Sequence, residues 1–242
     1  MWIMNRPTGA KVLQEPIIET LGREIVGGEL PAGERLTLER LQERFGVSRT
    51  VMRDCMRVLE SLRLVYPKRR LGLVVQESRF WNPMDPRIIR WRLAGPGRDR
   101  QYAELTELRI AVEPIAAAGA AERASDGARA EMVALAADLR RHGEAGELEA
   151  FLAADIAFHS LLLESSGNAM FASLRSVVAE VLSGRTQQGL MPFRPHSEAL
   201  DEHEAVAASI AAGDRVAAEA HMQVLVDEVR HALEKDLDGG AG

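Results

Sequence analysis

The chain of 242 residues contains a single cysteine, Cys55, and no long apolar run. One cysteine excludes an intramolecular disulfide and fits a reducing cytoplasm. No stretch approaches the roughly 18 apolar residues that a membrane-spanning helix requires, and the N-terminus lacks the apolar core of a secretion signal. We therefore expect a soluble cytoplasmic protein that does not interact with a membrane.

The chain also lacks a net positive charge: its formal charge is −6 and its isoelectric point is near 5.6. Taken alone, this balance argues against a partner of nucleic acids. The charges are segregated, however, because residues 1–78 hold 13 basic and 10 acidic side chains, which leaves a net −9 for the remainder. Within residues 49–72 the count is seven basic to two acidic, so the basic region is small and local.

The pattern of residues 12–77 predicts three short helices followed by a β-hairpin. Thr37 and Ser48 stand where the second and third helices need N-caps, and Gly46 supplies a stop between them. The segment "LVYPKRRLGLVV" has two β-prone pieces around a basic tip, which is typical of a hairpin. We expect one compact N-terminal domain here.

After a linker with a connecting helix at residues 78–97, the chain reads as helical throughout residues 98–238, with no convincing internal repeat. The fold class is therefore mainly α, with an antiparallel helical bundle as the second domain. The expected helices of this domain are Tyr102–Arg123, Ala128–Arg141, Leu148–Glu164, Ala169–Leu182, Glu198–Ala212 and Asp214 to about Leu237.

The segment "FGVSRTVMRDCMRVLESLRL" has the spacing of a helix-turn-helix, and the hairpin after it would be a wing. Its apolar stripe at positions 52, 55, 56, 59 and 62 predicts which face is buried. The opposite face and the hairpin tip would then present basic and polar groups to the major groove and backbone of double-stranded DNA. These are Ser48, Arg49, Thr50, Arg53, Arg57, Lys68, Arg69, Arg70 and Gly72. The alternative is a set of solvated arginines on a small helical domain.

In the second domain, the segment "AADIAFHSLLL" places Asp155 and His159 within an apolar helical stripe, and His203 interrupts a second stripe in the same way. A buried carboxylate needs partners, because leaving its charge unpaired costs several kcal/mol. An Asp and two His side chains suit a divalent ion such as Zn, Ni, Mn or Fe, or an anion. The alternative is an Asp–His hydrogen bond that only orients the core.

Arg109 in "ELRIAVEP" falls on the inward side of its helix. A buried guanidinium requires an anion, and its planar fork matches a carboxylate. That carboxylate would belong either to a small ligand or to Glu113, one turn further along the helix, as a structural salt bridge.

The segment from "ELPAGERL" to "RRLGLVV" resembles the winged helix-turn-helix of GntR-family bacterial regulators, including the "GVSRT" core and the wing glycine. The resemblance implies that Arg49 and Arg53 read bases and phosphates. One departure lies at the second helix, where a glutamate often follows a proline and a small residue and this chain has Thr37-Leu38-Glu39, so no contact is carried over from that helix. Cys55 takes the position of a small core residue.

The segments "ELRIAVEPIAAAGAAERAS", "DIAFHSLLLESSGNAMF" and "DEHEAVAASIAAGDRVAAEAHM" look like the FCD ligand-binding domain of the FadR branch of this family. In many members an Asp and three His bind a metal beside a carboxylate effector. The first three positions match Asp155, His159 and His203, but Leu225 stands where the fourth ligand is expected. His221, one turn earlier, is a possible substitute. The resemblance leaves open a three-ligand site for one divalent ion and a metal-free polar pocket.

The resemblance also makes Arg109 the first candidate for the effector carboxylate and Arg185, in the connection "SGRTQQGLMPFRP", the second. The phrase "FWNPMDPRIIRWRL" is similar to regulators of gluconate or galactonate catabolism. The resulting hypothesis is a dimeric repressor, not an enzyme, that leaves a pseudo-palindromic operator when it binds a sugar acid. The alternatives are a metal-sensing regulator and a small metal-dependent hydrolase that uses Asp155, His159 and His203.

Overall fold

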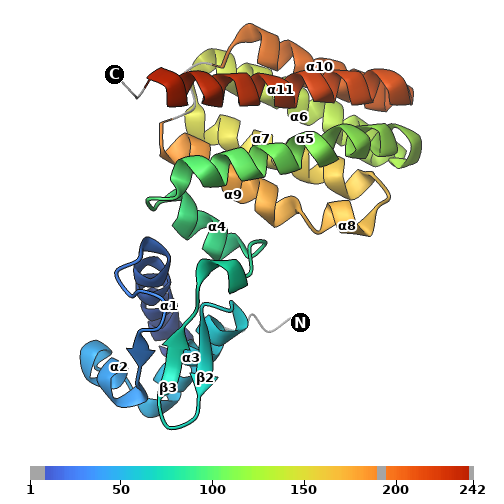
Figure 1. The fold of residues 1–242 in the computed structure, drawn as a ribbon. Helices are drawn as coiled ribbons and strands as arrows, with labels where there is room; N and C mark the ends of the chain where they lie inside the picture. The colour runs from blue at the N-terminus through green and yellow to red at the C-terminus, as the bar shows by residue number, and fades with distance from the viewer. Residues whose placement is uncertain (1–8, 190–194, 240–242) are drawn as a thin grey trace, which may run out of the picture. The chain divides into compact units, whose positions relative to one another are not determined.

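The computed structural model describes residues 9–189 and 195–239. The chain divides into two compact units, Met1–Pro96 and Gly97–Gly242. Figure 1 shows short helices with a small sheet in the first unit and only helices in the second. The predicted fold class, mainly α with a winged helix-turn-helix and a helical bundle, is confirmed.

The N-terminal unit begins with the helices α1 (Gly9–Gly27), α2 (Leu38–Phe45) and α3 (Arg49–Ser61). Both predicted N-caps form, because the side chain of Thr37 accepts from the Arg40 N–H and that of Ser48 accepts from the Val51 N–H. Gly46 ends α2 in the left-handed region with a φ of 64°. The two helices are thus joined by a tight turn whose chemistry is local.

The core of this unit includes the predicted stripe of α3 at positions 52, 55, 59 and 62, whereas Met56 is only partly buried and Val51 joins the core instead. Cys55 is fully buried, and burial raises the pKa of its thiol to about 11. The thiol is therefore a core group, in agreement with its place in the sequence pattern.

The wing is part of a three-stranded antiparallel sheet of order β1-β3-β2, formed by β1 (Arg35–Leu36), β2 (Val65–Lys68) and β3 (Gly72–Val75). The two-residue β1 was not predicted, since it is too short to show an alternating pattern. Gly72 has a φ of +85°, and a Cβ there would lie 2.8 Å from the Leu36 carbonyl oxygen. Glycine is therefore required for the close approach of β3 to β1.

Residues 78–97 contain a 3-10 turn, η1 (Ser78–Phe80), and the helix α4 (Pro86–Leu93). Asp85 caps α4 by accepting from the Arg87 N–H. Ile88 and Trp91 belong to the core cluster of the N-terminal unit. A Cβ on Gly22 of α1 would lie 2.3 Å from the Trp91 ring, so α1 and α4 meet through this glycine.

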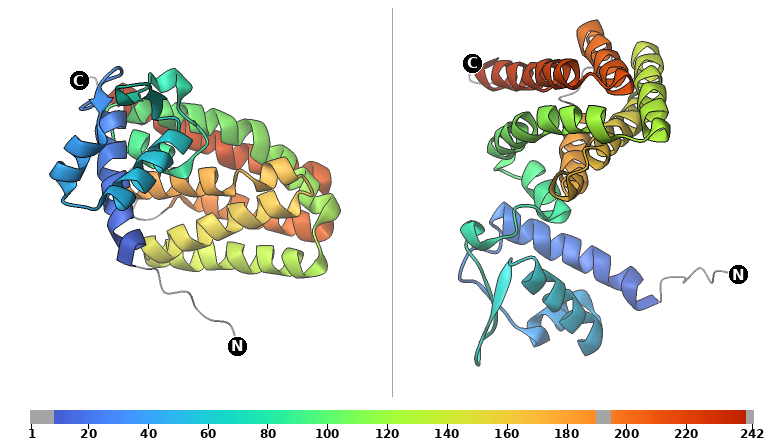
Figure 2. Two further views of the ribbon diagram at one scale, coloured as in Figure 1. Left: turned by 90° about the horizontal axis from the view of Figure 1, so that it is seen from below. Right: turned by 90° about the vertical axis from the view of Figure 1, so that its right-hand side faces the viewer.

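The C-terminal unit consists of the helices α5 (Arg98–Arg123), α6 (Asp126–Ala145), α7 (Leu148–Ser165), α8 (Ala169–Ala172), α9 (Arg175–Gln187), α10 (Ser197–Ala212) and α11 (Arg215–Gly239). They form a bundle in which α5 packs against α11 and α7, and α10 packs against α6 and α11. Figure 2 shows the long helices side by side in two further views. The run of alanines on α5 is buried, which lets its neighbours approach closely.

One expectation about this unit is wrong. The helix predicted from Ala169 to Leu182 is two helices, and α9 continues to Gln187, so Arg185 lies in a helix rather than in a connection. Gly184 did not end α9, because it is buried inside the bundle and tertiary packing outweighs its poor helix propensity. Part of the predicted connection, residues 190–194, lies outside the described residues. No helix in the described part of the chain is long and apolar enough to cross a membrane.

Candidate DNA-reading surface and effector site

The exposed face of α3 carries the cations that the sequence assigned to DNA. Arg49, Thr50 and Arg53 lie at its N-terminal end with exposed side chains. Among the described residues, Arg49 and Arg53 have no ion-pair partner, whereas Arg57 contacts Asp54 at 3.2 Å. The first two guanidinium groups are therefore free to bind an anion or a base edge.

Two of the predicted DNA contacts also have structural roles. The Ser48 Oγ accepts a hydrogen bond of 3.3 Å from the Val51 N–H, so it caps α3. Gly72 maintains the spacing of the wing sheet, as described above. Lys68, Arg69 and Arg70 are exposed at the tip of the hairpin, where Arg70 adopts a φ of 65°.

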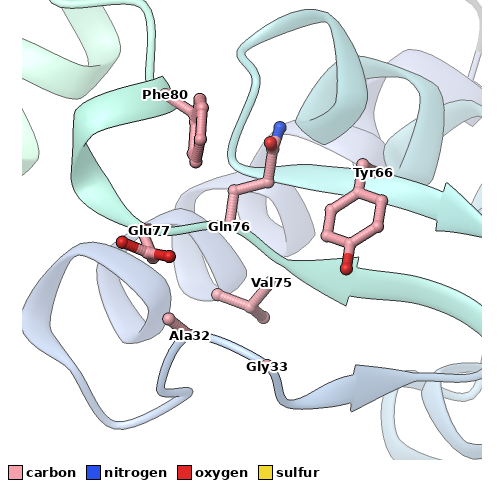
Figure 3. A pocket seen from close by; sticks show the side chains of 7 residues that line it. All are labelled: Ala32, Gly33, Tyr66, Val75, Gln76, Glu77 and Phe80. Carbon is pink, nitrogen blue, oxygen red and sulfur yellow. The ribbon is translucent and has the colours of Figure 1, made fainter.

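A hollow of about 450 Å³ lies in the same unit, at the base of the wing (Figure 3). The side chains of Tyr66 and Phe80 flank it. None of the residues predicted for DNA or effector binding lines it. Its lining residues are Ala32, Gly33, Tyr66, Val75, Gln76, Glu77 and Phe80.

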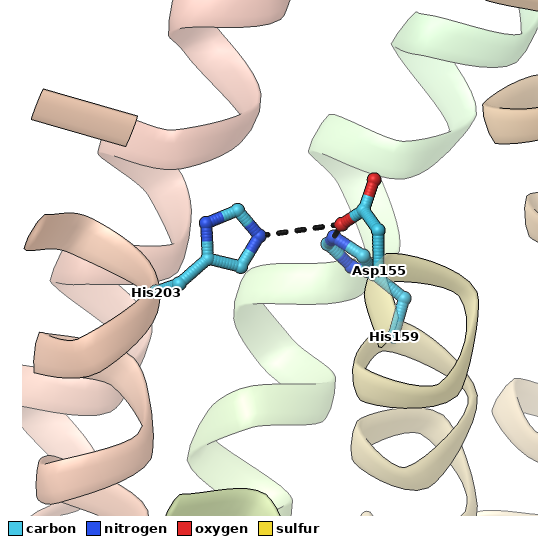
Figure 4. Close-up of side chains that lie close together, drawn as sticks. All are labelled: Asp155, His159 and His203. Atoms are coloured by element: carbon cyan, nitrogen blue, oxygen red, sulfur yellow. Dashed lines mark ion pairs between the residues drawn. The ribbon is translucent and has the colours of Figure 1, made fainter. Parts of the chain in front are cut away.

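In the C-terminal unit, the three predicted ligand residues come together in the interior (Figure 4). Asp155 and His159 lie on α7 and His203 on α10, and all three are at least 94% buried. The Asp155 Oδ1 lies 3.3 Å from His159 Nε2 and 3.4 Å from His203 Nε2. One candidate ligand atom from each residue lies within 4.8 Å of the others.

Two residues of α5 form a layer behind this cluster. Arg109 donates from Nε to Glu113 Oε1 at 2.8 Å and from Nη2 to Glu113 Oε2 at 3.2 Å. Glu113 Oε2 also lies 3.0 Å from His159 Nδ1, and Arg109 Nη2 lies 3.3 Å from His159 Nε2. The salt bridge to Glu113 that the sequence left as an alternative is thus present, and it extends to His159.

The pKa values in this layer follow from competition between burial and charge. Burial raises the pKa of Glu113, but Arg109 and His159 outweigh it and lower the pKa to about 2. Burial also raises the pKa of Asp155, and the two histidines hold it well below its usual range. Burial lowers the pKa of His159, yet Glu113 raises it to about 8. Both carboxylates are therefore ionised.

The cluster fits a divalent ion for a reason beyond its composition. Within the described residues, the buried atoms Asp155 Oδ1 and His203 Nε2 have no hydrogen-bond partner, although they lie 3.4 Å apart. A buried polar atom without a hydrogen bond costs about 1–3 kcal/mol of stability, and a bound ligand that contacts the atom would remove this cost. Ligands about 2.0–2.1 Å from a tetrahedral zinc lie about 3.3 Å from one another, close to both distances from Asp155 Oδ1. The same two contacts are ion pairs of Asp155 with the histidines, which is the alternative that only orients the core.

The tautomer of His203 agrees with this fit. His203 Nδ1 donates to the Ala199 carbonyl oxygen at 2.6 Å, which leaves the Nε2 lone pair for a ligand. His221 does not join the cluster: its side chain is 40% exposed and its Nδ1 lies 2.8 Å from Glu202 Oε2. Leu225 is buried. Among the described residues the group has three members.

Further buried polar atoms without a hydrogen-bond partner occur in the bundle, among them atoms of Tyr102 and Arg185, and sequence reasoning missed Tyr102. The Tyr102 hydroxyl, at the start of α5, has no hydrogen-bond partner among the described residues, and burial raises its pKa to about 12. The Arg185 Nε is likewise unpartnered, and burial together with the charge of Arg109 lowers the pKa of Arg185. Arg185 is partly buried, and the charge of Asp155 acts on its pKa in the opposite direction to that of Arg109.

Residues 104–235 match the FCD domain family, and residues 13–75 match the family described as bacterial regulatory proteins, gntR family. The chain belongs to the GntR family. The first of these matches covers more than half of the chain, and together the two contain the helix-turn-helix, the wing and the buried cluster.

Several proteins of this family are similar over most of their length. The galactonate operon transcriptional repressor of Escherichia coli K12 is 32% identical over 84% of this chain and 89% of its own. The regulator LutR of Bacillus subtilis is 28% identical over 86% and 95%, respectively. The solved structure of Lar, which controls the agr system of Listeria monocytogenes, shares the fold with a TM-score of 0.57 at 18% identity, covering 96% and 99% of the two chains.

The family assignment gives each unit its general role. The GntR helix-turn-helix binds DNA, and the FCD domain binds a small-molecule effector. The relatives are transcriptional regulators, so the chain is a regulator and the hydrolase alternative is set aside.

Proposed function

We propose that this protein represses genes of sugar-acid catabolism and leaves its operator when it binds an aldonic acid of the galactonate type. The observation that carries this proposal is the buried cluster of Asp155, His159 and His203, with the guanidinium of Arg109 in contact with it. Unpartnered polar atoms of Tyr102 and Arg185 occur in the same bundle. The name of the Escherichia coli relative, a galactonate operon repressor, supports the choice of acid.

On the DNA side, two copies of the chain bind the two halves of a pseudo-palindrome. Arg49 and Arg53 contact guanine edges or phosphates, because their guanidinium groups are exposed and unpaired within the described residues. Phosphate and groove contacts come from Ser48, Thr50, Arg57, Lys68, Arg69, Arg70 and the backbone at Gly72.

On the acid side, Arg185 is the stronger candidate for the carboxylate. The fork of Arg109 is occupied by Glu113, whereas Arg185 is desolvated and has a free Nε. A sugar acid has one carboxylate and several hydroxyl groups, which suits one cation beside Tyr102, Asp155 and the two histidines. Arg109 remains within reach as a second donor through its contact with His159.

Asp155 Oδ1, His159 Nε2 and His203 Nε2 are the atoms that would hold one divalent ion, with Zn, Ni or Mn as candidates. When bound, the ion would bind acid oxygens as a Lewis acid. With three protein ligands, the site keeps positions for the oxygens of the acid or for water.

The test is release of the protein from a DNA duplex selected by the wild-type chain from a random pool. Galactonate should weaken this binding by about 5- to 150-fold, the usual range of allosteric coupling. Arg185→Gln should keep DNA affinity and lose the response to galactonate. Arg175→Gln, on the same helix but exposed and paired with Glu164, is the matched control and should respond normally.

Three results would contradict this assignment. The first is a panel of aldonic acids that leaves binding unchanged, and the second is an Arg185→Gln variant that is still released normally. The third is release by Zn²⁺ without any acid, which would favour a metal sensor, the second reading of the same cluster.

A further inference from the structure

His159 Nε2 is the one predicted ligand atom that already has a partner. Arg109 Nη2 lies 3.3 Å from it, whereas Asp155 Oδ1 and His203 Nε2 have no hydrogen-bond partner among the described residues. A metal ion needs His159 in the tautomer with its proton on Nδ1, the atom 3.0 Å from Glu113 Oε2. In that tautomer the Nε2 lone pair accepts from the guanidinium N–H. Any cation that binds at Asp155 must also approach this positive charge.

The same guanidinium is anchored independently of His159. Its Nε donates to Glu113 Oε1 at 2.8 Å, and both residues are on α5, one turn apart, with Glu113 fully buried. The Nη2 atom divides its donation between Glu113 Oε2 and His159 Nε2, at 3.2 and 3.3 Å. Arg109 is thus able to give up the histidine while it keeps its ion pair with Glu113.

We propose that Arg109 couples the metal site to the acid site: it competes with a divalent ion for His159 Nε2, and once displaced it donates to the carboxylate or a hydroxyl group of the acid. The part that concerns the acid rests on the proposed function. The part that concerns the ion rests only on the contacts among Arg109, Glu113 and His159.

The consequence is cooperative binding with a fixed sign. Arg109 weakens the binding of the ion when no acid is present, because the ion must displace it. When the acid accepts a hydrogen bond from the displaced guanidinium, this penalty is removed, and the acid therefore strengthens ion binding. By linkage, the ion strengthens acid binding to the same extent.

The test measures Zn²⁺ affinity of the full-length protein by competition with a chromogenic chelator, with and without sodium galactonate, against a blank for galactonate alone. The main variant is Arg109→Lys, which keeps a cation for Glu113 but lacks the second donor that reaches His159. It should bind Zn²⁺ on the order of 10-fold more tightly without acid, as expected for the loss of one competing charge-assisted hydrogen bond. Galactonate should tighten Zn²⁺ binding by about 5-fold or more in the wild type and by a smaller factor in the variant, where only the direct contact between the ion and the acid oxygens remains.

The control is Arg100→Lys, on the same helix, where the arginine is exposed and paired with Glu104. It should match the wild type in both measurements. Equal or weaker Zn²⁺ binding by Arg109→Lys overturns the inference, as does the absence of Zn²⁺ binding by the wild type. If Arg109→Lys does not fold, the wild type still tests the inference, because Zn²⁺ binding that galactonate leaves unchanged would overturn it. Release from DNA is measured separately, and its failure would affect the proposed function without changing the Zn²⁺ result for Arg109.

Discussion

The two units use arginine in opposite environments. On α3, Arg49 and Arg53 are exposed and have no ion-pair partner among the described residues. In the bundle, Arg109 is 4% exposed and makes a bidentate ion pair with Glu113. DNA supplies its own charges and arrives from solvent, so its readers must be free. A small acid needs a desolvated site in which each charged group has a partner, so the arginines that bind it must be held in position.

This difference predicts where mutations affect folding and where they affect only binding. Exposed ion pairs contribute about 0–1 kcal/mol, whereas removing one partner of a buried pair costs about 3–5 kcal/mol. Substitutions on α3 should therefore change DNA affinity at constant stability. Substitutions in the buried layer should change stability first.

The largest effect is expected for Glu113→Ala. The carboxylate is fully buried between Arg109 and His159, and its removal leaves the guanidinium without its anion. The free energy of unfolding should fall by about 3–5 kcal/mol, as measured by urea denaturation.

Glu122→Ala is the matched control, since Glu122 lies on the same helix but is exposed, and its pairs with Arg123 and Arg215 are at the surface. It should cost no more than about 1 kcal/mol. Similar losses for the two variants would break the contrast between the units, because the buried ion pair would then be no different from a surface pair.

The second effect concerns DNA. Arg53→Ala should weaken binding to the selected duplex by about 1–3 kcal/mol and reduce its salt dependence, with no change in the unfolding midpoint. Arg57→Ala, one turn further along α3, should lose less, because Arg57 already contacts Asp54. Fluorescence anisotropy at several salt concentrations measures both. Unchanged binding by Arg53→Ala would remove α3 as the reading helix.

The sequence predicted the parts of the molecule that depend on local chemistry. Thr37, Gly46 and Ser48 mark helix ends with side chains and backbone conformations that act within one turn, so these boundaries are correct. The end of α9 is different, because packing inside the bundle carries the helix past Gly184. Only the folded chain shows that Arg185 lies in this helix.

The candidate site divides in the same way. The spacing of Asp155 and His159 within one helix predicts their shared face, and the structure places His203 beside them. The contact between Glu113 and His159 joins α5 to α7, and Tyr102 joins the set only through burial. Neither has a signal in a single sequence, since an ordinary salt bridge and an ordinary core tyrosine show the same pattern.

The smallest expected effect concerns Ser48, where a contribution to stability can be separated from a contact with DNA. Ser48 caps α3 and also stands beside the DNA-reading arginines, so Ser48→Ala should cost about 1 kcal/mol of stability through the lost bond to the Val51 N–H. Ser48→Asn retains a capping side chain and should keep that stability. If the role of Ser48 is the cap alone, Ser48→Asn also keeps its DNA affinity at temperatures where both proteins are folded. Loss of affinity in this stable variant would instead show that the hydroxyl contacts DNA, and the surface of α3 would then include a residue that both holds the helix and reads its target.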